Sequence, residues 1–421
     1  MVFIIASCTS VYNMETGMNT LTSDEMAGRQ AGSPGGAAAA KYIQDEFTAL
    51  GIEQHLQPFH FLTYSPDGFS AALRLTQQGQ VSECALGVDF TPTRISAANN
   101  VKGAITFDRN DADLDKKILV TDKLFSLKDI AKKPKGILFV EKSLVKRVEV
   151  RETPMPVFSI SKALYDQLAG GSATEVEMSI SAKFEPLIYQ NVIGVIPGKN
   201  RKEAVVISAH YDGCGFDDCG IYKGAVDNAS GVVTMLKCAE ILADYYRGSA
   251  PSVDIVFAAF DGEESGLIGS QYFMQQSVYK KLSNINIDCV GKGNLYVQSD
   301  SENTDLAKAV SEHITGSQTG ALGGFSDNMV FSFYKCGAVL ITTMQKSDMG
   351  EIHTVKDTAD DVDRMLLLKL ANDIADYMTD RCGKSEKDEK AAPSKKTEEP
   401  APSATEAPPA SDGAAESEEA A

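Results

Sequence analysis

Short apolar runs alternate with amphipathic segments in the C-terminal half of the chain. Apolar runs of a few residues, bounded by turn residues, are typical of buried strands, and longer segments with apolar residues three or four apart are typical of helices. Strands are predicted at residues 190–196, 205–209, 253–260, 285–288, 294–298 and 339–343. Helices are predicted at residues 228–246, 264–282, 302–315 and 361–380. This alternation predicts an α/β fold with a mostly parallel sheet sandwiched by helices.

The N-terminal half has a different pattern of apolar and polar residues. A helix is predicted at residues 37–50, where apolar residues recur at helical spacing before Gly51. Residues 63–186 instead carry short alternating stretches, which predict a smaller β-rich inserted domain. A continuous part of the main sheet is the alternative, but the alternation of strands and helices breaks here. We therefore expect a main domain of residues 18–62 and 187–382.

Both ends of the chain are expected to lie outside this folded body. Residues 383–421 consist mostly of Ala, Pro, Glu, Ser and Lys, so they predict a disordered tail. Residues 1–17 are interpreted as a truncated lipoprotein-type signal and a linker. Ile5-Ala6-Ser7-Cys8 resembles a bacterial lipobox, in which Cys8 would carry lipid and tether the protein to a membrane. The predicted location is the bacterial cell envelope, on its periplasmic side, or outside the cell; an N-terminal cluster that packs on the body is the alternative.

Charge and cysteine content narrow the possible partners and the compartment. The 421 residues carry a net charge of −18, which argues against a nucleic-acid partner because phosphates would be repelled. No apolar run is long enough to predict a membrane-spanning helix. Cys214 and Cys219 flank a loop and would form a disulfide in an oxidising compartment, whereas metal binding by this pair is the less favoured hypothesis. Cys238 and Cys289 are predicted to be buried thiols.

Imidazole and carboxylate side chains stand where predicted strands end. His210 directly follows the run 205–209, and Glu263 and Glu264 follow the run 253–260. The carboxyl ends of strands in open α/β sheets are where ligands bind. The candidate metal ligands are His210, Asp227, Glu264, Asp288 and His353. Two histidines and three carboxylates suit a pair of zinc ions roughly 3.5–4 Å apart, with cobalt or manganese as substitutes.

Two further acids are placed to support these ligands. Asp212 lies two residues after His210, on the same side of an extended chain, and so can accept the imidazole N–H. Asp357 lies four residues after His353 and is expected to do the same there. Each acid alone has a structural explanation: Asp227 suits a helix N-cap, and paired glutamates suit a helix N-terminus. Their combination at strand ends favours a metal site.

Four motifs resemble the zinc aminopeptidase family that includes bacterial leucyl aminopeptidases, aminopeptidase Y and the glutamate carboxypeptidase relatives. They are Ser208-Ala209-His210-Tyr211-Asp212, Gly224-Ala225-Val226-Asp227-Asn228-Ala229-Ser230-Gly231, the segment from Phe260 to Ser270, and His353-Thr354-Val355-Lys356-Asp357-Thr358. Met26-Ala27-Gly28-Arg29 adds to the likeness, and the insert resembles a protease-associated domain.

The resemblance implies a role for each candidate residue. His210 and Asp288 would bind one zinc, Glu264 and His353 the other, and Asp227 would bridge them. Glu263 would be the general base on a zinc-bridging water. The implied activity is removal of N-terminal residues from peptides by an enzyme with two Zn²⁺ per chain.

Two positions depart from the family pattern, and they leave alternatives open. Ile352 stands where the family often carries a tyrosine, and Asn328 replaces a histidine, where it would donate a hydrogen bond to a substrate. A single-zinc glutaminyl cyclase and a carboxypeptidase acting on acidic dipeptides share the expected fold. A metal-free binding module is the non-enzymatic alternative, and it predicts missing ligands.

Overall fold

A large mixed sheet forms the centre of the computed structural model, which describes residues 11–93, 99–123, 132–149, 155–171, 173–344 and 351–383. In sheet order the strands are β16 (Gln318–Ala321), β15 (Tyr296–Ser299), β17 (Gly337–Thr342), β14 (Lys281–Ile287), β10 (Asn200–His210), β13 (Val253–Phe260), β9 (Glu175–Ile196), β1 (Glu53–Gln77) and β2 (Gln80–Glu83), while β4 (Asn99–Gly103) pairs with β9. The neighbours β13, β10, β14 and β17 run parallel, and antiparallel strands flank them.

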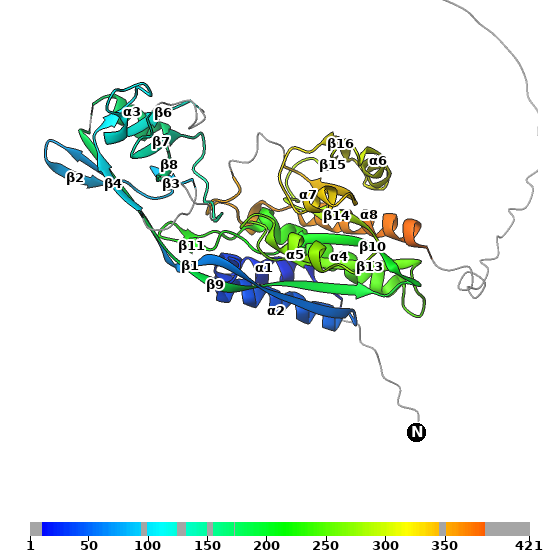
Figure 1. Ribbon diagram of the computed structural model, residues 1–421. Helices are drawn as coiled ribbons and strands as arrows, with labels where there is room; N and C mark the ends of the chain where they lie inside the picture. Colours follow the sequence, from blue (N-terminus) through cyan, green and yellow to red (C-terminus); the bar gives the residue numbers. More distant parts are fainter. Residues whose placement is uncertain are drawn as a thin grey trace, which may run out of the picture. The chain divides into compact units, whose positions relative to one another are not determined.

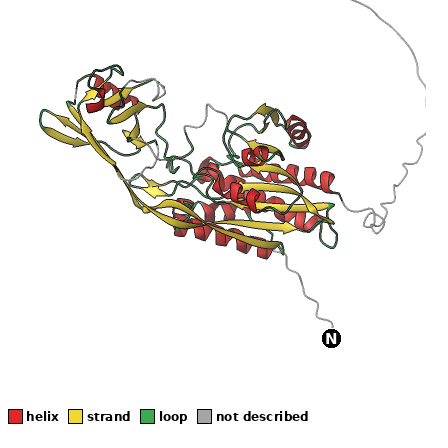
Figure 2. Ribbon diagram, in the orientation of Figure 1, coloured by secondary structure: helices red, strands yellow, loops and turns green. Residues whose placement is uncertain are grey.

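Helices cover both faces of this sheet (Figures 1 and 2). The helices on one face are α1 (Met14–Leu21), α2 (Pro34–Ala49), α4 (Ser230–Tyr245), α6 (Thr304–His313) and α8 (Arg364–Cys382), and those on the other are α5 (Ile268–Gln276) and α7 (Asn328–Phe333). In β10, Val205 and Ile207 pack into the core on the face covered by α4 and α8, and Val206 packs into the core on the face covered by α5 and α7. A strand buried on both faces has no polar alternation, which is why the sequence shows continuous apolar runs. The predicted α/β class is confirmed.

The insert contains a second sheet with its own core. Its strands are β3 (Phe90–Pro92), β8 (Val157–Ile160), β7 (Gly136–Val140), β6 (Ile118–Thr121) and β5 (Ile105–Thr106), and α3 (Lys162–Ala169) packs beside them. The expected boundaries after residue 62 and before residue 187 fall inside β1 and β9. These two strands pair along most of their length, with a register shift between Tyr64 and Phe69.

Short elements complete the described chain. They are the hairpin β11 (Phe216–Asp217) and β12 (Gly220–Ile221), the 3₁₀ turns Asp24–Arg29, Leu114–Lys116 and Ala359–Asp361, and a π-type turn at Ala225–Ala229. The last of these turns carries Asp227, one of the predicted ligands.

The predicted helix at residues 264–282 was wrong in extent. Helix α5 spans only Ile268–Gln276, because Gly266 and Leu267 both have positive φ values, of 112° and 62°. Ser277 then takes an extended conformation, and β14 begins at Lys281. A segment that changes conformation twice cannot carry one continuous helical pattern, so the apolar spacing was misleading there.

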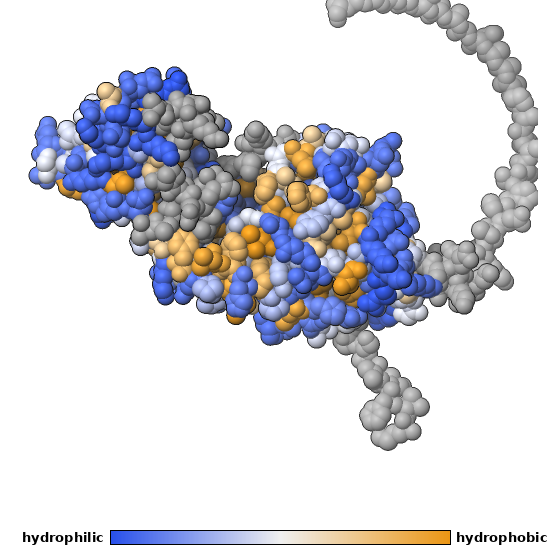
Figure 3. All heavy atoms as spheres, viewed as in Figure 1, coloured by the Kyte–Doolittle hydropathy of each residue, from blue (hydrophilic) through white to orange (hydrophobic). Residues whose placement is uncertain are grey.

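Surface hydropathy differs between the two parts of the described chain. On the face in Figure 3, hydrophobic residues gather over the main domain, whereas the insert presents mostly hydrophilic residues. Within the described ranges, every helix is too short or too polar to cross a bilayer. Cys8 and residues 384–421 of the predicted tail lie outside the described residues. The predicted linker was wrong at its end, because α1 begins at Met14, and Tyr12 and Met14 are buried in the core.

Candidate metal centre

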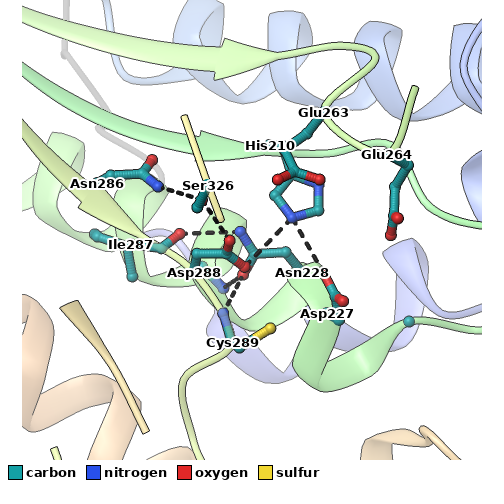
Figure 4. A network of polar contacts seen from close by, with 12 residues as sticks. His210, Asp227, Asn228, Glu263, Glu264, Asn286, Ile287, Asp288, Cys289 and Ser326 are labelled. Carbon is teal, nitrogen blue, oxygen red and sulfur yellow. Dashed lines mark hydrogen bonds and ion pairs between the residues drawn. The ribbon is translucent and has the colours of Figure 1, made fainter. Parts of the chain in front are cut away.

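His210 is the last residue of β10, and its imidazole lies between two carboxylates (Figure 4). Its Nε2 is 3.2 Å from Asp227 Oδ1 and 3.3 Å from Asp288 Oδ1. Asp288 follows β14, the parallel neighbour of β10, so both side chains emerge at the same edge of the sheet. We call His210, Asp227 and Asp288 the first group; their ligand atoms lie within 4.8 Å of one another.

His353 lies on the other side of Asp227. Its Nε2 is 2.9 Å from Asp227 Oδ2 and 3.1 Å from Glu264 Oε2. We call Asp227, Glu264 and His353 the second group. The two oxygens of Asp227 are therefore divided between the two histidines, which is the arrangement expected of a carboxylate that bridges two cations. All five predicted ligands converge, from segments far apart in the chain.

Asp357 holds the Asp227 turn in place. Its carboxylate accepts the amide hydrogens of Val226 and Asp227 at 2.7 and 3.1 Å. Its expected contact with the imidazole of His353 was therefore the wrong interpretation, since both of its oxygens serve the bridging aspartate. Asn228 adds a second support by donating from Nδ2 to the carbonyl of Ile287 at 2.9 Å.

Asp212 aligns the paired glutamates. Its carboxylate accepts the amide hydrogens of Glu263 and Glu264 at 3.1 and 3.2 Å. The same carboxylate lies 3.5 Å from His210 Nδ1, which is nearer, at 3.2 Å, to the backbone oxygen of Asp212. Asp212 therefore supports the imidazole through its backbone oxygen, with the carboxylate that was predicted to accept this hydrogen bond lying slightly farther away. The alignment of the two acids is an additional role that the sequence did not suggest.

The site concentrates negative charge in a buried space. Burial raises the pKa of Glu263 well above its usual range, and the neighbouring Glu264 adds to this shift. Burial alone would lower the pKa of His210, but Asp288 and Glu263 raise it well above the ordinary histidine value. Such shifts indicate carboxylates that need a nearby positive charge.

One carboxylate oxygen of the second group also calls for a nearby positive charge. Glu264 Oε1 is buried and has no hydrogen-bond partner among the described residues. A buried carboxylate oxygen without a partner is costly unless a cation binds it. The residues present therefore fit a pair of divalent cations: two imidazoles and three carboxylates, with one carboxylate shared.

A cavity of about 110 Å³ opens beside these ligands. Its lining includes Glu263, three of the predicted ligands and a set of apolar side chains. The ligands are Asp227, Asp288 and His353, and the apolar side chains are Phe325, Leu340, Met344 and Ile352. Asn328 was predicted to contact a substrate, but it is fully buried at the start of α7. The described lining passes through its neighbours Phe325 and Ser326 instead, so direct substrate contact by Asn328 is not supported.

Arg29 is a supporting residue to which the sequence assigned no role. It is fully buried, and its guanidinium donates to four carbonyl oxygens, including those of Tyr211 at 2.8 Å and Gly224 at 2.8 Å. It thus ties the chain after His210 to the turn that carries Asp227. The only advance signal was the motif Met26-Ala27-Gly28-Arg29, because the partners lie 182 and 195 residues away in the sequence.

Two more contacts were missed for the same reason. Ser326 Oγ donates to Asp288 Oδ2 at 2.5 Å and accepts a hydrogen bond from Asn286 Nδ2 at 2.7 Å, which orients a ligand of the first group. In the second group, the amide of Lys146 donates to the carbonyl of His353 at 2.9 Å. Lys146 belongs to the insert, so the insert contributes to the support of this histidine.

The cysteines behave partly as expected. Cys238 and Cys289 are buried thiols, as predicted. Cys214 and Cys219 are both free in the structure. Cys219 Sγ donates to the carbonyl of Leu86 at 3.0 Å, whereas Cys214 Sγ lies beside Glu264 and His353.

The fold and the paired groups define an α/β protein with two adjoining sets of side chains that could each hold a metal ion. Residues 191–378 match the family described as Peptidase family M28. The matched region contains all five ligands and Glu263.

Individual known proteins and solved structures are also similar to this chain. The chain is 36% identical over 144 residues to Aminopeptidase YwaD of Bacillus subtilis, which covers 32% of the chain and 29% of that protein. The solved structure of the zinc aminopeptidase BSAP from Bacillus subtilis superimposes with a TM-score of 0.70 at 20% identity, covering 90% of this chain and 97% of that one. The aminopeptidase from Aneurinibacillus sp. strain AM-1 has a TM-score of 0.67 at 22% identity, covering 90% and 96%. At this level of identity, the solved structures establish the fold.

Proposed function

We propose that the protein is a two-zinc aminopeptidase that removes N-terminal residues from peptides. The observation that carries the proposal is the division of the Asp227 carboxylate between His210 and His353, at 3.2 and 2.9 Å. His210 and Asp288 would hold one zinc, Glu264 and His353 the other, and Asp227 both. Bound zinc supplies Lewis acidity, which polarises a carbonyl and makes water more acidic. Supporting evidence comes from two similar proteins, the zinc aminopeptidase BSAP and Aminopeptidase YwaD.

Glu263 is the proton carrier in this proposal. It lines the cavity together with Asp227 and Asp288, and its amide is fixed by Asp212. Because burial raises its pKa, the Glu263 carboxylate accepts a proton more readily than an exposed glutamate does. It would take a proton from the attacking water and give it to the nitrogen of the leaving amine, as a general base that then acts as a general acid.

The charge of the cavity favours an aminopeptidase over a carboxypeptidase. The described lining holds neither lysine nor arginine, and Glu263 is its one acid that is not assigned to a zinc ion. A C-terminal carboxylate needs a cationic side chain to bind it, whereas the ammonium group at a peptide's N-terminus can pair with a carboxylate such as Glu263. The apolar residues Leu340, Met344 and Ile352 favour an apolar N-terminal side chain. The paired ligand groups likewise favour two ions over the single zinc of a glutaminyl cyclase.

The test combines metal analysis with a substrate panel. Protein stripped with a chelator and reloaded with zinc should contain two ions per chain and should cleave aminoacyl chromophores. Glu263→Gln should retain both ions and lose about 10²–10⁴-fold in turnover, the usual contribution of general acid–base catalysis. Glu302→Gln, on an exposed glutamate paired with Lys335, is the matched control and should keep full activity. Near-full activity in Glu263→Gln would refute the assignment of the base.

We also propose that Cys8 carries a lipid that tethers the protein to a membrane of the cell envelope. The support is the lipobox-like sequence Ile5-Ala6-Ser7-Cys8. Intact-mass analysis of protein expressed in a bacterial host from its full natural reading frame would show an acylated N-terminal cysteine. A mature chain with an unmodified Met1 would refute this proposal without affecting the peptidase assignment.

A further inference from the structure

Cys214 lies in the loop that follows β10, four residues after the ligand His210. Its side chain is buried, and its Sγ lies within 4.8 Å of the ligand atoms of both Glu264 and His353. Its contact with the protein backbone is weak, since Sγ is 3.9 Å from the carbonyl oxygen of Lys146. The thiol is thus placed against the second group without a strong hydrogen bond of its own.

Glu264, beside Cys214, has a buried carboxylate oxygen without a hydrogen-bond partner among the described residues. The Glu264 side chain is 4% exposed, and its Oε2 lies 3.1 Å from His353 Nε2. Its other oxygen, Oε1, is buried without a hydrogen-bond partner in the described chain. A buried thiol that served only as a small apolar group would suit a nonpolar neighbour better than an unpartnered carboxylate.

We propose that Cys214 is a fourth protein ligand of the second zinc, beside Asp227, Glu264 and His353. This inference rests on the two-zinc function proposed above. The donors of the second group would then be one sulfur, one imidazole nitrogen and two carboxylates. Those of the first group are one imidazole and two carboxylates, with the carboxylate of Asp227 common to both.

The difference in donor number has a chemical consequence. Structural zinc sites are usually closed by four protein ligands, whereas catalytic sites hold three and keep one position open. The second zinc would therefore be the tightly held, structural ion, and the chemistry would be centred on the ion of the first group. Thiolate also binds zinc in preference to magnesium or manganese, so the second group would be the more selective one.

The test identifies the atoms bound to the metal and does not depend on measuring activity. X-ray absorption on the wild-type protein loaded with two zinc ions should show a sulfur neighbour at about 2.3 Å, the usual zinc–sulfur distance. Cobalt loaded in place of zinc should give the near-ultraviolet charge-transfer band of a cobalt–thiolate bond. Both signals should disappear in Cys214→Ser.

Two matched variants identify which thiol is responsible. Cys289 follows Asp288 and lines the cavity, so it is the other thiol near the ligands. Cys219 lies five residues after Cys214 and donates to Leu86. Cys289→Ser and Cys219→Ser should both keep the sulfur signals. In chelator competition, Cys214→Ser should bind one of its two zinc ions at least about tenfold more weakly, because even the partners of ligands contribute about 10–100-fold.

The outcomes separate this inference from the proposed function. Active wild-type protein with two zinc ions and no sulfur neighbour would overturn the role of Cys214 and leave the aminopeptidase proposal intact. A sulfur signal that survives in Cys214→Ser and is lost in Cys289→Ser would also overturn it. Protein that binds no zinc and cleaves no aminoacyl substrate would overturn both. If Cys214→Ser does not fold, the wild-type protein and Cys289→Ser together decide the matter, because a sulfur signal that is lost in Cys289→Ser would overturn the role of Cys214.

Discussion

Replacement of Arg29 should produce the largest loss of stability among single substitutions near the site. Its guanidinium donates to the carbonyl oxygens of Leu21 at 2.7 Å, Tyr211 at 2.8 Å, Lys223 at 2.6 Å and Gly224 at 2.8 Å. Arg29→Met fills similar volume but removes every donor. A buried acceptor left without a donor costs about 1–3 kcal/mol, so four acceptors at the low end of that range give a loss of at least about 4 kcal/mol.

A more conservative substitution, Arg29→Lys, tests the same hydrogen bonds with a smaller expected loss of stability. Arg29→Lys keeps the charge but replaces the planar fork of donors with a compact ammonium, so it should lose roughly half as much, about 2 kcal/mol. Arg247→Met is the control, since this arginine is half exposed and pairs only with Asp244 three residues away; it should cost less than about 1 kcal/mol.

Urea unfolding of the metal-free proteins, followed by circular dichroism, measures these differences by linear extrapolation. Because typical proteins are stable by only about 5–15 kcal/mol, Arg29→Met is expected near the limit of folding. A folded Arg29→Met variant that loses less than about 1 kcal/mol would refute the reasoning. It would mean that water or other donors satisfy the four carbonyls.

Three further substitutions test individual contacts. Asp212→Asn leaves one of the two glutamate amides facing an NH₂ group; it should lower kcat roughly 10–100-fold through misplacement of Glu263, measured by steady-state kinetics, and an unchanged kcat would contradict the alignment role. Lys146→Met removes the cation beside Asp217, whose side chain is 10% exposed, and the donor to the carbonyl of Phe216, while Asp217 keeps its hydrogen bonds from Tyr222 and Cys219. It should cost about 3 kcal/mol in urea unfolding, whereas the exposed Lys183→Met should be neutral. The hydrogen bond from His313 to Asp380 raises the pKa of His313, so its contribution is present below the unfolded pKa of about 6.5 and is lost as pH rises through the folded value. His313→Asn should therefore lower Tm slightly at low pH and leave it unchanged at high pH, and a constant Tm difference would contradict the linkage.

The metal ligands could be predicted from the sequence because each signal is local. His210 directly ends an apolar run, and Asp288 and Glu264 stand close after other runs. Parallel neighbours in a sheet bring such strand ends to one edge, so proximity follows from the fold class. The pairing of oxygens with imidazoles at Asp227 required the structure, because it depends on the turn that Asp357 holds.

The supporting residues could not be predicted because their partners are remote. The acceptors of Arg29 are backbone carbonyls, which leave no mark on residue type, and three of the four lie more than 180 residues away in the sequence. Cys214 was assigned with Cys219 to a possible disulfide because the two are close in sequence. In the folded loop their side chains diverge, one to Leu86 and the other to the second group.

The change in apolar pattern located the insert correctly but placed its boundaries inside two continuous strands. The pattern changes near residue 63, yet β1 continues from Glu53 to Gln77 and β9 from Glu175 to Ile196. Residues 181–188 of β9 include no buried side chain, so the middle of the ladder carries no apolar periodicity that would mark one continuous strand. Because this ladder joins the insert to the main sheet, and because Lys146 of the insert holds the carbonyl of His353, the insert is structurally linked to the second group. A substitution in the insert that shifts Lys146 should therefore affect the ion held by His353 before it affects the ion held by His210.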